Sequence, residues 1–126
     1  MKYIDNIEKA TKENNNFRQV LSTNKYSQLV VMSLLPGEEI GAEVHPETDQ
    51  FIRIEEGQAT VILAGEETKV EDDFAIIIPA GMEHNVINTG NEELKLYTIY
   101  SPAHHPDGTI HKNKAEAEAS EAAHHH

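Results

Sequence analysis

The amino-acid sequence predicts an all-β domain, built as a sandwich or a barrel. From residue 51 to residue 101 the chain consists of short runs rich in β-branched and aromatic residues. Gly, Asn, Asp or Pro separates these runs every 8–12 residues or so, a spacing typical of all-β folds. No segment with helical periodicity lies between them, which argues against alternating strands and helices. The length of 126 residues fits one domain with its own core.

The residues before this region predict a short helix and two more strands. Residues 6–16, NIEKATKENNN, suit a short polar helix that the Asn run would end. Residues 17–34 predict two strands around a turn at residues 23–25, TNK. Pro and Gly in LPGEE, residues 35–39, then predict a turn.

Six strand candidates follow this turn, each bounded by turn residues. They are FIRIEEG (51–57), QATVILAG (58–65), ETKVEDD (67–73), FAIIIPAG (74–81), MEHNVINTG (82–90) and EELKLYTIYS (92–101).

The chain changes character after the last strand candidate. SPAHHPDGTIH resembles a loop, whereas KNKAEAEASEAA has high helix propensity but no apolar face beyond Ala. We therefore expect an N-terminal polar segment over 1–16, a barrel over 17–101, and an exit loop with a helical or disordered tail over 102–123. Residues 124–126 are three histidines that resemble a purification tag.

Composition excludes several classes of function. The formal charge of −12 argues against a nucleic-acid partner and disfavours strongly anionic substrates, unless a local basic group overrides the mean. The absence of cysteine excludes disulfides, thiolate metal sites and thiol nucleophiles. No apolar run is long enough to span a membrane, and the N-terminus does not resemble a signal peptide. We therefore expect a cytoplasmic protein without a membrane partner.

Four polar side chains are placed to converge in such a barrel. Strand side chains alternate between faces, so Glu43 and His45 share one face, and Gln50 joins them if the next strand is a neighbour. His84 follows a Pro–Gly turn in a later strand. Two imidazoles, a carboxylate and an amide oxygen make a divalent-metal site. A polar patch on a strand is the alternative.

These residues resemble the two motifs of the cupin superfamily. The first motif, G(X)5HXH(X)3–4E(X)6G, aligns with Gly37, Glu43, His45, Gln50 and Gly57, with Glu43 and Gln50 in place of a His and a Glu. The second, G(X)5PXG(X)2H(X)3N, aligns with Asp73, Pro79, Gly81, His84 and Asn88, with Asp73 in place of the Gly. The resemblance covers about residues 34–100. Within the superfamily, the chain looks like small one-domain cupins described as mannose-6-phosphate-isomerase-like.

The resemblance implies a double-stranded β-helix, the jelly-roll barrel of RmlC-like cupins, with a short N-terminal helix added here. It also implies a bound divalent metal, which would be Zn, Fe, Mn or Ni, with Glu43, His45, Gln50 and His84 as its ligands. A small-molecule ligand or substrate and a homodimer are the implied partners.

Three residues are candidates for catalysis. Glu43 could ligate the metal, orient His45 or move a proton. Tyr97, or Tyr100 beside it, could present a phenol at the barrel mouth, with ordinary strand packing as the alternative. His105 belongs to a histidine-rich run, HHPDGTIH, which could form a lid or a proton shuttle; a plain exit loop is the alternative.

The expected function is that of a metal-dependent enzyme on a small, oxygen-rich carbonyl or sugar-like molecule. Zn or Ni would suit isomerisation, and Fe(II) or Mn(II) would suit oxygenation. A non-catalytic cupin that binds or senses a small ligand is the alternative, and a metal-free barrel kept for assembly is a third.

A sugar phosphate would need a basic anchor, yet Arg53 faces away from Gln50 and is expected to pair with an acid such as Glu55. Lys95 is the other candidate.

Overall fold

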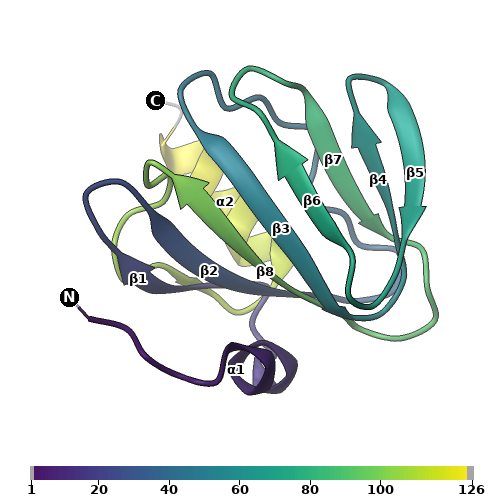
Figure 1. The fold of residues 1–126 in the computed structure, drawn as a ribbon, viewed down its shortest axis with the longest axis horizontal. Coiled ribbons are helices and arrows are strands. Elements are labelled where there is room, and N and C mark those ends of the chain that lie inside the picture. Colours follow the sequence, from purple (N-terminus) through teal and green to yellow (C-terminus); the bar gives the residue numbers. More distant parts are fainter. Residues whose placement is uncertain (1, 125–126) are drawn as a thin grey trace.

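The described part of the chain, residues 2–124 of a computed structural model, forms two antiparallel β-sheets that face each other (Figure 1). The larger sheet contains, in spatial order, β6 (Ala75–Ile78), β3 (Asp49–Glu56), β8 (Leu94–Ser101), β2 (Gln28–Leu34), β1 (Arg18–Thr23) and β9 (Ile110–His111). The smaller sheet contains β5 (Glu66–Val70), β4 (Ala59–Leu63) and β7 (His84–Asn88). Strands far apart in sequence are neighbours, as in a jelly roll, so the predicted all-β barrel is confirmed.

The segment between β2 and β3 extends the smaller sheet along the edge of β7. Its backbone hydrogen bonds join Gly37 N to Asn88 O at 3.0 Å and Ile40 N to Val86 O at 2.9 Å. The segment therefore runs antiparallel to β7 although it is too irregular to count as a strand. This pairing lays the first motif along the second.

Alternation of side chains along each strand decides what lies inside the barrel. Ile52 and Ile54 in β3 and Leu96 in β8 have no exposed surface. Burying a side chain of this size contributes about 1.5–3 kcal/mol. The same alternation turns Gln50 and Tyr100 inward, where they lie opposite each other in the β3–β8 ladder. A polar region therefore continues directly from the apolar core at this end of the barrel.

Helix α1 (Ile7–Glu13) packs on the outer face of the larger sheet. Its N-cap is Asn6, whose side-chain oxygen accepts a hydrogen bond from Lys9 N at 3.0 Å. Within the helix, Thr11 is fully buried. The helix gives way to Asn14, the first residue of the Asn run, which confirms the predicted end.

Lys95 ties this helix to the sheet. The side chain lies on the outer face of β8 and is only 4% exposed. Its ammonium donates hydrogen bonds to Asn14 O and to Ser33 Oγ, the latter at 3.0 Å, and pairs with Glu93 at 3.0 Å. An ammonium has three N–H donors, so this buried charge is well satisfied. Lys95 is therefore committed to the structure of the outer face.

The exit segment after β8 holds more structure than the sequence predicts. It returns to the larger sheet as β9, in which His111 lies opposite Arg18 of β1. The chain then forms helix α2 (Lys114–His124), one of the two outcomes expected for the tail. Neither helix in the described residues is long and apolar enough to cross a membrane. The tag assignment of His125 and His126 lies outside the described residues.

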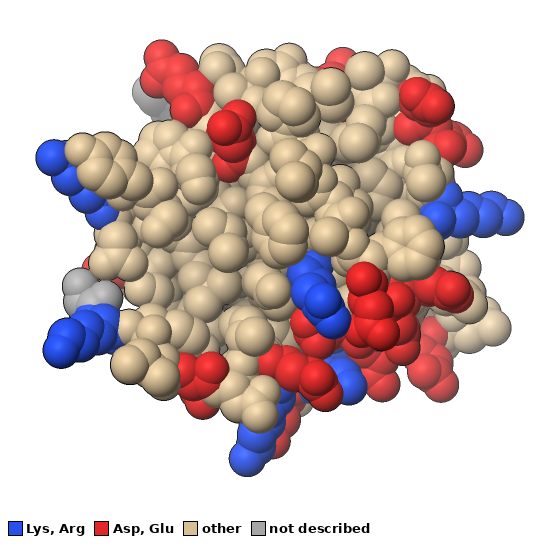
Figure 2. All heavy atoms as spheres, in the orientation of Figure 1, with Lys and Arg blue, Asp and Glu red and all other residues tan. Residues whose placement is uncertain are grey.

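Acidic side chains gather at one end of the barrel. Figure 2 shows them at the lower right, where Figure 1 places the end of β3 and the turns that lead into β6 and β8. Glu56, Glu71, Asp72 and Glu92 line a surface hollow there. Gln50 is the second residue of β3 and Glu56 ends it, about 20 Å away along the strand. The strongest negative charge on this face therefore lies at the opposite end of the barrel from the predicted metal ligands.

We predict that Lys95→Met lowers the free energy of unfolding by about 2–3 kcal/mol, because Asn14 O and Ser33 Oγ lose their charged donor while buried. Lys69→Met, on the exposed strand β5, is the matched control and should change stability by less than about 0.5 kcal/mol. Urea denaturation followed by circular dichroism measures both. Equal effects of the two substitutions would show that Lys95 is not a structural tie.

Candidate metal centre

Three backbone hydrogen bonds bring the two motifs together. Glu43 N donates to His84 O and His84 N donates to Glu43 O, both at 2.9 Å. Gly81 N also donates to His45 O at 2.8 Å. Gly81 has a φ of +84°, a conformation that glycine adopts without strain, so the turn before His84 can present its N–H to His45.

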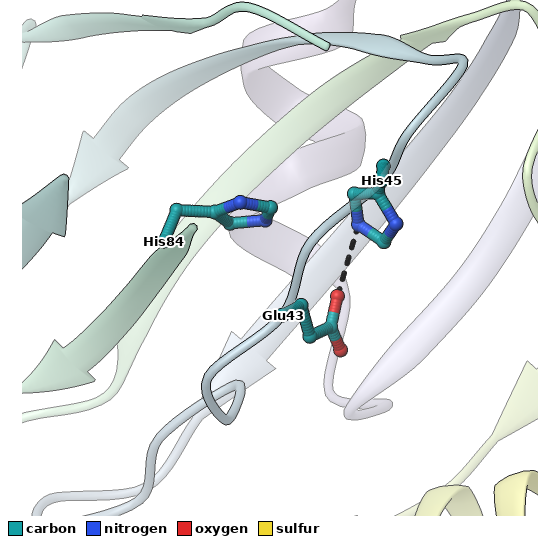
Figure 3. Close-up of side chains that lie close together, drawn as sticks. All are labelled: Glu43, His45 and His84. Carbon is teal, nitrogen blue, oxygen red and sulfur yellow. Dashed lines mark ion pairs between the residues drawn. The ribbon is translucent and has the colours of Figure 1, made fainter. Parts of the chain in front are cut away.

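The side chains of Glu43, His45 and His84 point toward one another across this junction (Figure 3). Their potential ligand atoms all lie within 4.8 Å of one another, and the two imidazole centroids are 5.0 Å apart. His45 Nε2 lies 3.0 Å from Glu43 Oε2. Val44, between them in sequence, points outward and is 49% exposed, as the alternation predicts. These three residues form a group that could hold a metal ion.

The hydrogen bonding of His84 leaves its inner nitrogen free. Nδ1 lies 3.0 Å from Met82 O, and a carbonyl only accepts, so Nδ1 carries the hydrogen. In the neutral imidazole, Nε2 then presents a lone pair. This Nε2 is buried and has no hydrogen-bond partner. A backbone carbonyl that fixes the tautomer of a histidine is the usual support of a metal ligand.

Gln50 is oriented in a similar way. Its side-chain nitrogen donates to Thr98 Oγ1 at 3.0 Å, and Thr98 is fully buried. The amide oxygen, Oε1, is buried without a partner. Gln50 and Thr98 both face the interior, beside Tyr100, whose ring lies 5.9 Å from that of His45. The side-chain oxygen of Gln50 therefore points toward the polar end of the barrel, where it has no hydrogen-bond partner.

Glu43 is held in its charged form. Burial by itself raises the pKa of this carboxyl, but the hydrogen-bonding contact with His45 and the charge of Arg18 outweigh burial. The net effect lowers the pKa of Glu43 below its usual value. A carboxylate that is already ionised can bind a metal or accept a proton without a preceding deprotonation.

The histidine-rich run HHPDGTIH lies over the site because a buried glutamine fixes it there. Gln28 of β2 is 1% exposed. Its side-chain oxygen accepts hydrogen bonds from His104 N and His105 N, at 3.1 and 2.9 Å. Its nitrogen donates to His105 O at 2.7 Å. One inward side chain thus positions the start of the run.

His104 and His105 cover different parts of the site. The His104 ring lies 4.1 Å from the His45 ring, while His105 Nε2 lies 3.4 Å from Tyr100 Oη. Partial burial and the neighbouring His45 lower the pKa of His104. Burial and the charge of Arg18 lower the pKa of His105 to about 2. His105, a predicted catalytic residue, thus lies next to Tyr100 rather than against Glu43.

The structure corrects the placement of Tyr97. Thr98 and Tyr100 face the interior, so the alternation of β8 turns Tyr97 to the outer face, where its ring lies 6.1 Å from Phe51. The tyrosine at the site is Tyr100, which is 2% exposed. Burial raises its pKa well above the usual value, so its hydroxyl stays protonated and can only donate or accept hydrogen bonds.

The two candidate phosphate anchors, Arg53 and Lys95, lie on the outer face of the larger sheet. Arg53 forms ion pairs with Glu55 at 2.7 Å and Asp73 at 2.9 Å on the outer face, which confirms the expected pairing with an acid. Lys95 is bound at the outer face beside α1. Neither reaches the interior.

Sequence reasoning missed the basic residue and the amide that do reach the interior. Arg18 and Gln28 are both 1% exposed and lie on inward positions of β1 and β2. The signal was available, because each lies two residues before a core valine, Val20 or Val30, on the same face of its strand.

Comparison with known proteins identifies the class. The chain matches the Cupin domain family over residues 30–100. It therefore belongs to this family, and the resemblance of the two motifs is confirmed. The uncharacterised protein YrkC of Bacillus subtilis is 51% identical over 125 residues, which cover 94% of this chain and 67% of that protein.

Two further proteins share the domain. The crystal structure of BH2720 from Bacillus halodurans superimposes with a TM-score of 0.93 at 48% identity, covering 94% of this chain and 95% of that one. Polyketide synthase CurC of Streptomyces cyaneus is 30% identical over 105 residues, covering 79% of this chain and 67% of that protein.

We predict that acid destabilises the protein partly through His105. In the unfolded chain this imidazole takes up a proton as the pH falls below about 6.5, whereas in the folded protein it does so only near 2. The stability contributed by His105 is therefore complete above about pH 6.5 and is lost progressively below it. His105→Gln should reduce the loss of stability between pH 7 and pH 5 by about 1–2 kcal/mol.

Denaturant unfolding of both proteins at the two pH values, with a chelator present, measures this difference. The substitution leaves the contacts of Gln28 intact, because they go to the backbone of residues 104 and 105. Parallel pH dependence in the variant and the unmodified protein would contradict the prediction.

Proposed function

We propose that this cupin is a metal-dependent enzyme that acts on a small, oxygen-rich molecule. One observation carries the proposal. Among the described residues, Gln50 Oε1 and His84 Nε2 are buried side-chain atoms with no hydrogen-bond partner, and His45 Nε2 has only the Glu43 carboxylate, 3.0 Å away. Buried polar atoms are nearly always paired, because leaving one unpaired costs about 1–3 kcal/mol. A metal ion would satisfy all three together.

The ligand types support a divalent transition metal. Glu43, His45 and His84 offer one carboxylate and two imidazoles, and Gln50 adds a neutral amide oxygen. This set suits Zn, Fe, Mn or Ni rather than a hard cation such as Ca²⁺. With Glu43 as the one charged ligand, a 2+ ion keeps a net positive charge. Bound there, it would polarise a carbonyl or hydroxyl oxygen of the substrate.

Side chains around the site would handle the substrate. Glu43 is ionised, and the carboxylate oxygen that it does not give to the metal could accept a proton from a carbon or hydroxyl next to a carbonyl. Tyr100 would donate a hydrogen bond to a substrate oxygen. His105, in the tautomer that carries its hydrogen on Nε2, would donate to the Tyr100 oxygen and leave the one hydroxyl hydrogen of Tyr100 for the substrate. Isomerisation uses this proton transfer directly, and oxygenation of the same class of substrate is the second form of the proposal.

A non-catalytic cupin that binds a small ligand is the alternative, and one observation favours it. His104 lies against His45, with their ring centroids 4.1 Å apart, and so covers the cluster on the side of the exit segment. A site closed in this way suits retention of a small ligand. The homodimer and the cytoplasmic location expected from the sequence remain part of the proposal.

We predict one divalent metal per chain in protein that lacks the terminal histidines and is purified without chelating resin. His84→Ala and His45→Ala should each lower metal affinity by at least about 100-fold, because each removes a ligand. His111→Ala is the matched control, since this equally buried imidazole contacts Arg18 and not the cluster. Elemental analysis and chelator competition measure the effect.

A metal content near zero that His84→Ala does not change would overturn the proposal. If metal is bound, oxygen uptake during a screen of hydroxy-ketones and diketones identifies an oxygenase, whereas isomer formation without oxygen uptake identifies an isomerase. Bound metal without turnover across the screen would support the ligand-binding alternative.

The role of Gln50 gives a separate prediction. Gln50→Glu adds a second carboxylate to the cluster and should raise the affinity for a divalent metal by about tenfold, and Gln50→Leu should lower it by a similar factor. Thr98 can donate its hydroxyl hydrogen to the new carboxylate, so the orientation is kept. Unchanged affinity in both variants would mean that Gln50 is not a ligand.

A further inference from the structure

A second pocket adjoins the metal-ligand cluster on the side of the C-terminal helix. It has a volume of about 610 Å³, within the range of small-molecule sites. Its walls come from β1, β9, the histidine-rich run and α2, and include Arg18, His104, His105, His111 and Glu121. The His104 ring also lies 4.1 Å from the His45 ring, so one imidazole stands between this pocket and the cluster.

The guanidinium of Arg18 forms the inner wall of this pocket, and its charge is poorly compensated. The side chain is 1% exposed, and its Nε is buried without a hydrogen-bond partner. Nη1 lies 3.3 Å from His111 Nδ1, which must be the acceptor because a guanidinium only donates. An isolated buried charge costs several kcal/mol, so such groups are normally paired.

The carboxylate nearest to Arg18 does not complete the pair. Glu121 Oε1 of α2 lies 3.8 Å from Nη1, beyond hydrogen-bond distance, and the Glu121 side chain is 48% exposed. Glu121 therefore marks the solvent edge of the pocket and leaves the guanidinium of Arg18 without a carboxylate at hydrogen-bond distance. A carboxylate matches the planar fork of a guanidinium through two parallel N–H···O bonds.

The charge of Arg18 also extends over the metal-ligand cluster. It is among the causes that lower the pKa values of Glu43, His104 and His105. The strongly acidic surface lies at the opposite end of the barrel, so the overall charge of −12 does not dominate here.

We infer that this pocket binds a small organic acid, whose carboxylate pairs with the guanidinium of Arg18 and displaces Glu121. His111 holds the guanidinium in place through Nδ1, and Ser120 offers a hydroxyl along the wall. A displacement of His104 would let the rest of the acid reach His45. That the acid is also the substrate of the metal centre rests on the function proposed above; its binding by Arg18 does not.

Binding of malonate, followed by NMR of the histidine side chains, tests this inference. The full chain is titrated as purified and again after treatment with a chelator, with neutral malonamide and inorganic phosphate as comparisons. We expect malonate to bind both forms and malonamide to bind neither. Arg18→Met should weaken malonate binding by at least about tenfold. Glu121→Gln should strengthen it about two- to fivefold, because it removes a competing charge from an exposed position.

Two substitutions at different positions are used so that the test does not depend on one variant. Glu121 is half exposed, so its substitution tests the site even if Arg18→Met fails to fold. Equal binding of malonamide, or malonate affinity unaffected by both substitutions, would overturn the inference. So would malonate binding confined to the metal-loaded form, or phosphate binding more tightly than malonate through Arg18. Malonate binding that depends on Arg18 in protein without metal would support the anion site even if the proposed metal function failed.

Discussion

The reciprocal backbone hydrogen bonds between Glu43 and His84 are the constraint on which the site depends. They join an irregular segment to the start of β7, and so close the barrel at the end where the polar side chains lie. Because side chains alternate on both sides of this bridge, fixing one register places Glu43, His45 and His84 on the same interior face. A slip of one residue would turn Val44 inward and both Glu43 and His45 outward. The metal-capable cluster is therefore a consequence of one register.

Charge is distributed so that the two ends of the barrel differ. Acidic turns collect at the end where β3 finishes, while the other end holds imidazoles, a phenol and the buried guanidinium of Arg18. Burial and the charge of Arg18 lower the pKa values of His105 and His111, so these rings resist a second positive charge. The imidazoles can therefore accept hydrogen bonds or cover a ligand without adding charge. Arg18 supplies the permanent charge on this side of the site.

The sequence predicted features that depend on a single strand, such as which side chains share a face. It did not predict features that depend on contacts between segments far apart in the chain. Alternation was enough to place Glu43 and His45 together and Gln50 on the inner face, and turn residues were enough to place most strands. Alternation could not decide between Tyr97 and Tyr100, which lie on opposite faces of β8. The choice depends on which face of β8 meets the smaller sheet.

Alternation could have placed Arg18 and Gln28 inside the barrel, but the partners that they meet there depend on tertiary pairing. Nothing near Arg18 in the sequence indicates that β9 will lie beside it, or that the exit segment will return over the barrel to α2. The position of that segment follows from Gln28, which lies 76 residues earlier in the chain than His104. Such contacts are invisible to periodicity.

The exchange of ligand types relative to the cupin motif bears on both proposals. A glutamate in place of the motif's first histidine and a glutamine in place of its glutamate leave one carboxylate in the set, as in the motif, but move it from β3 to the segment that pairs with β7. A divalent ion held by Glu43, His45, Gln50 and His84 would retain positive charge, and Arg18 adds another beside it. Two cationic centres in a largely buried space favour an anionic, oxygen-rich ligand over a neutral sugar, because only an anion offsets both. Under both proposals, the ligand set and the adjoining pocket would therefore favour the same class of molecule.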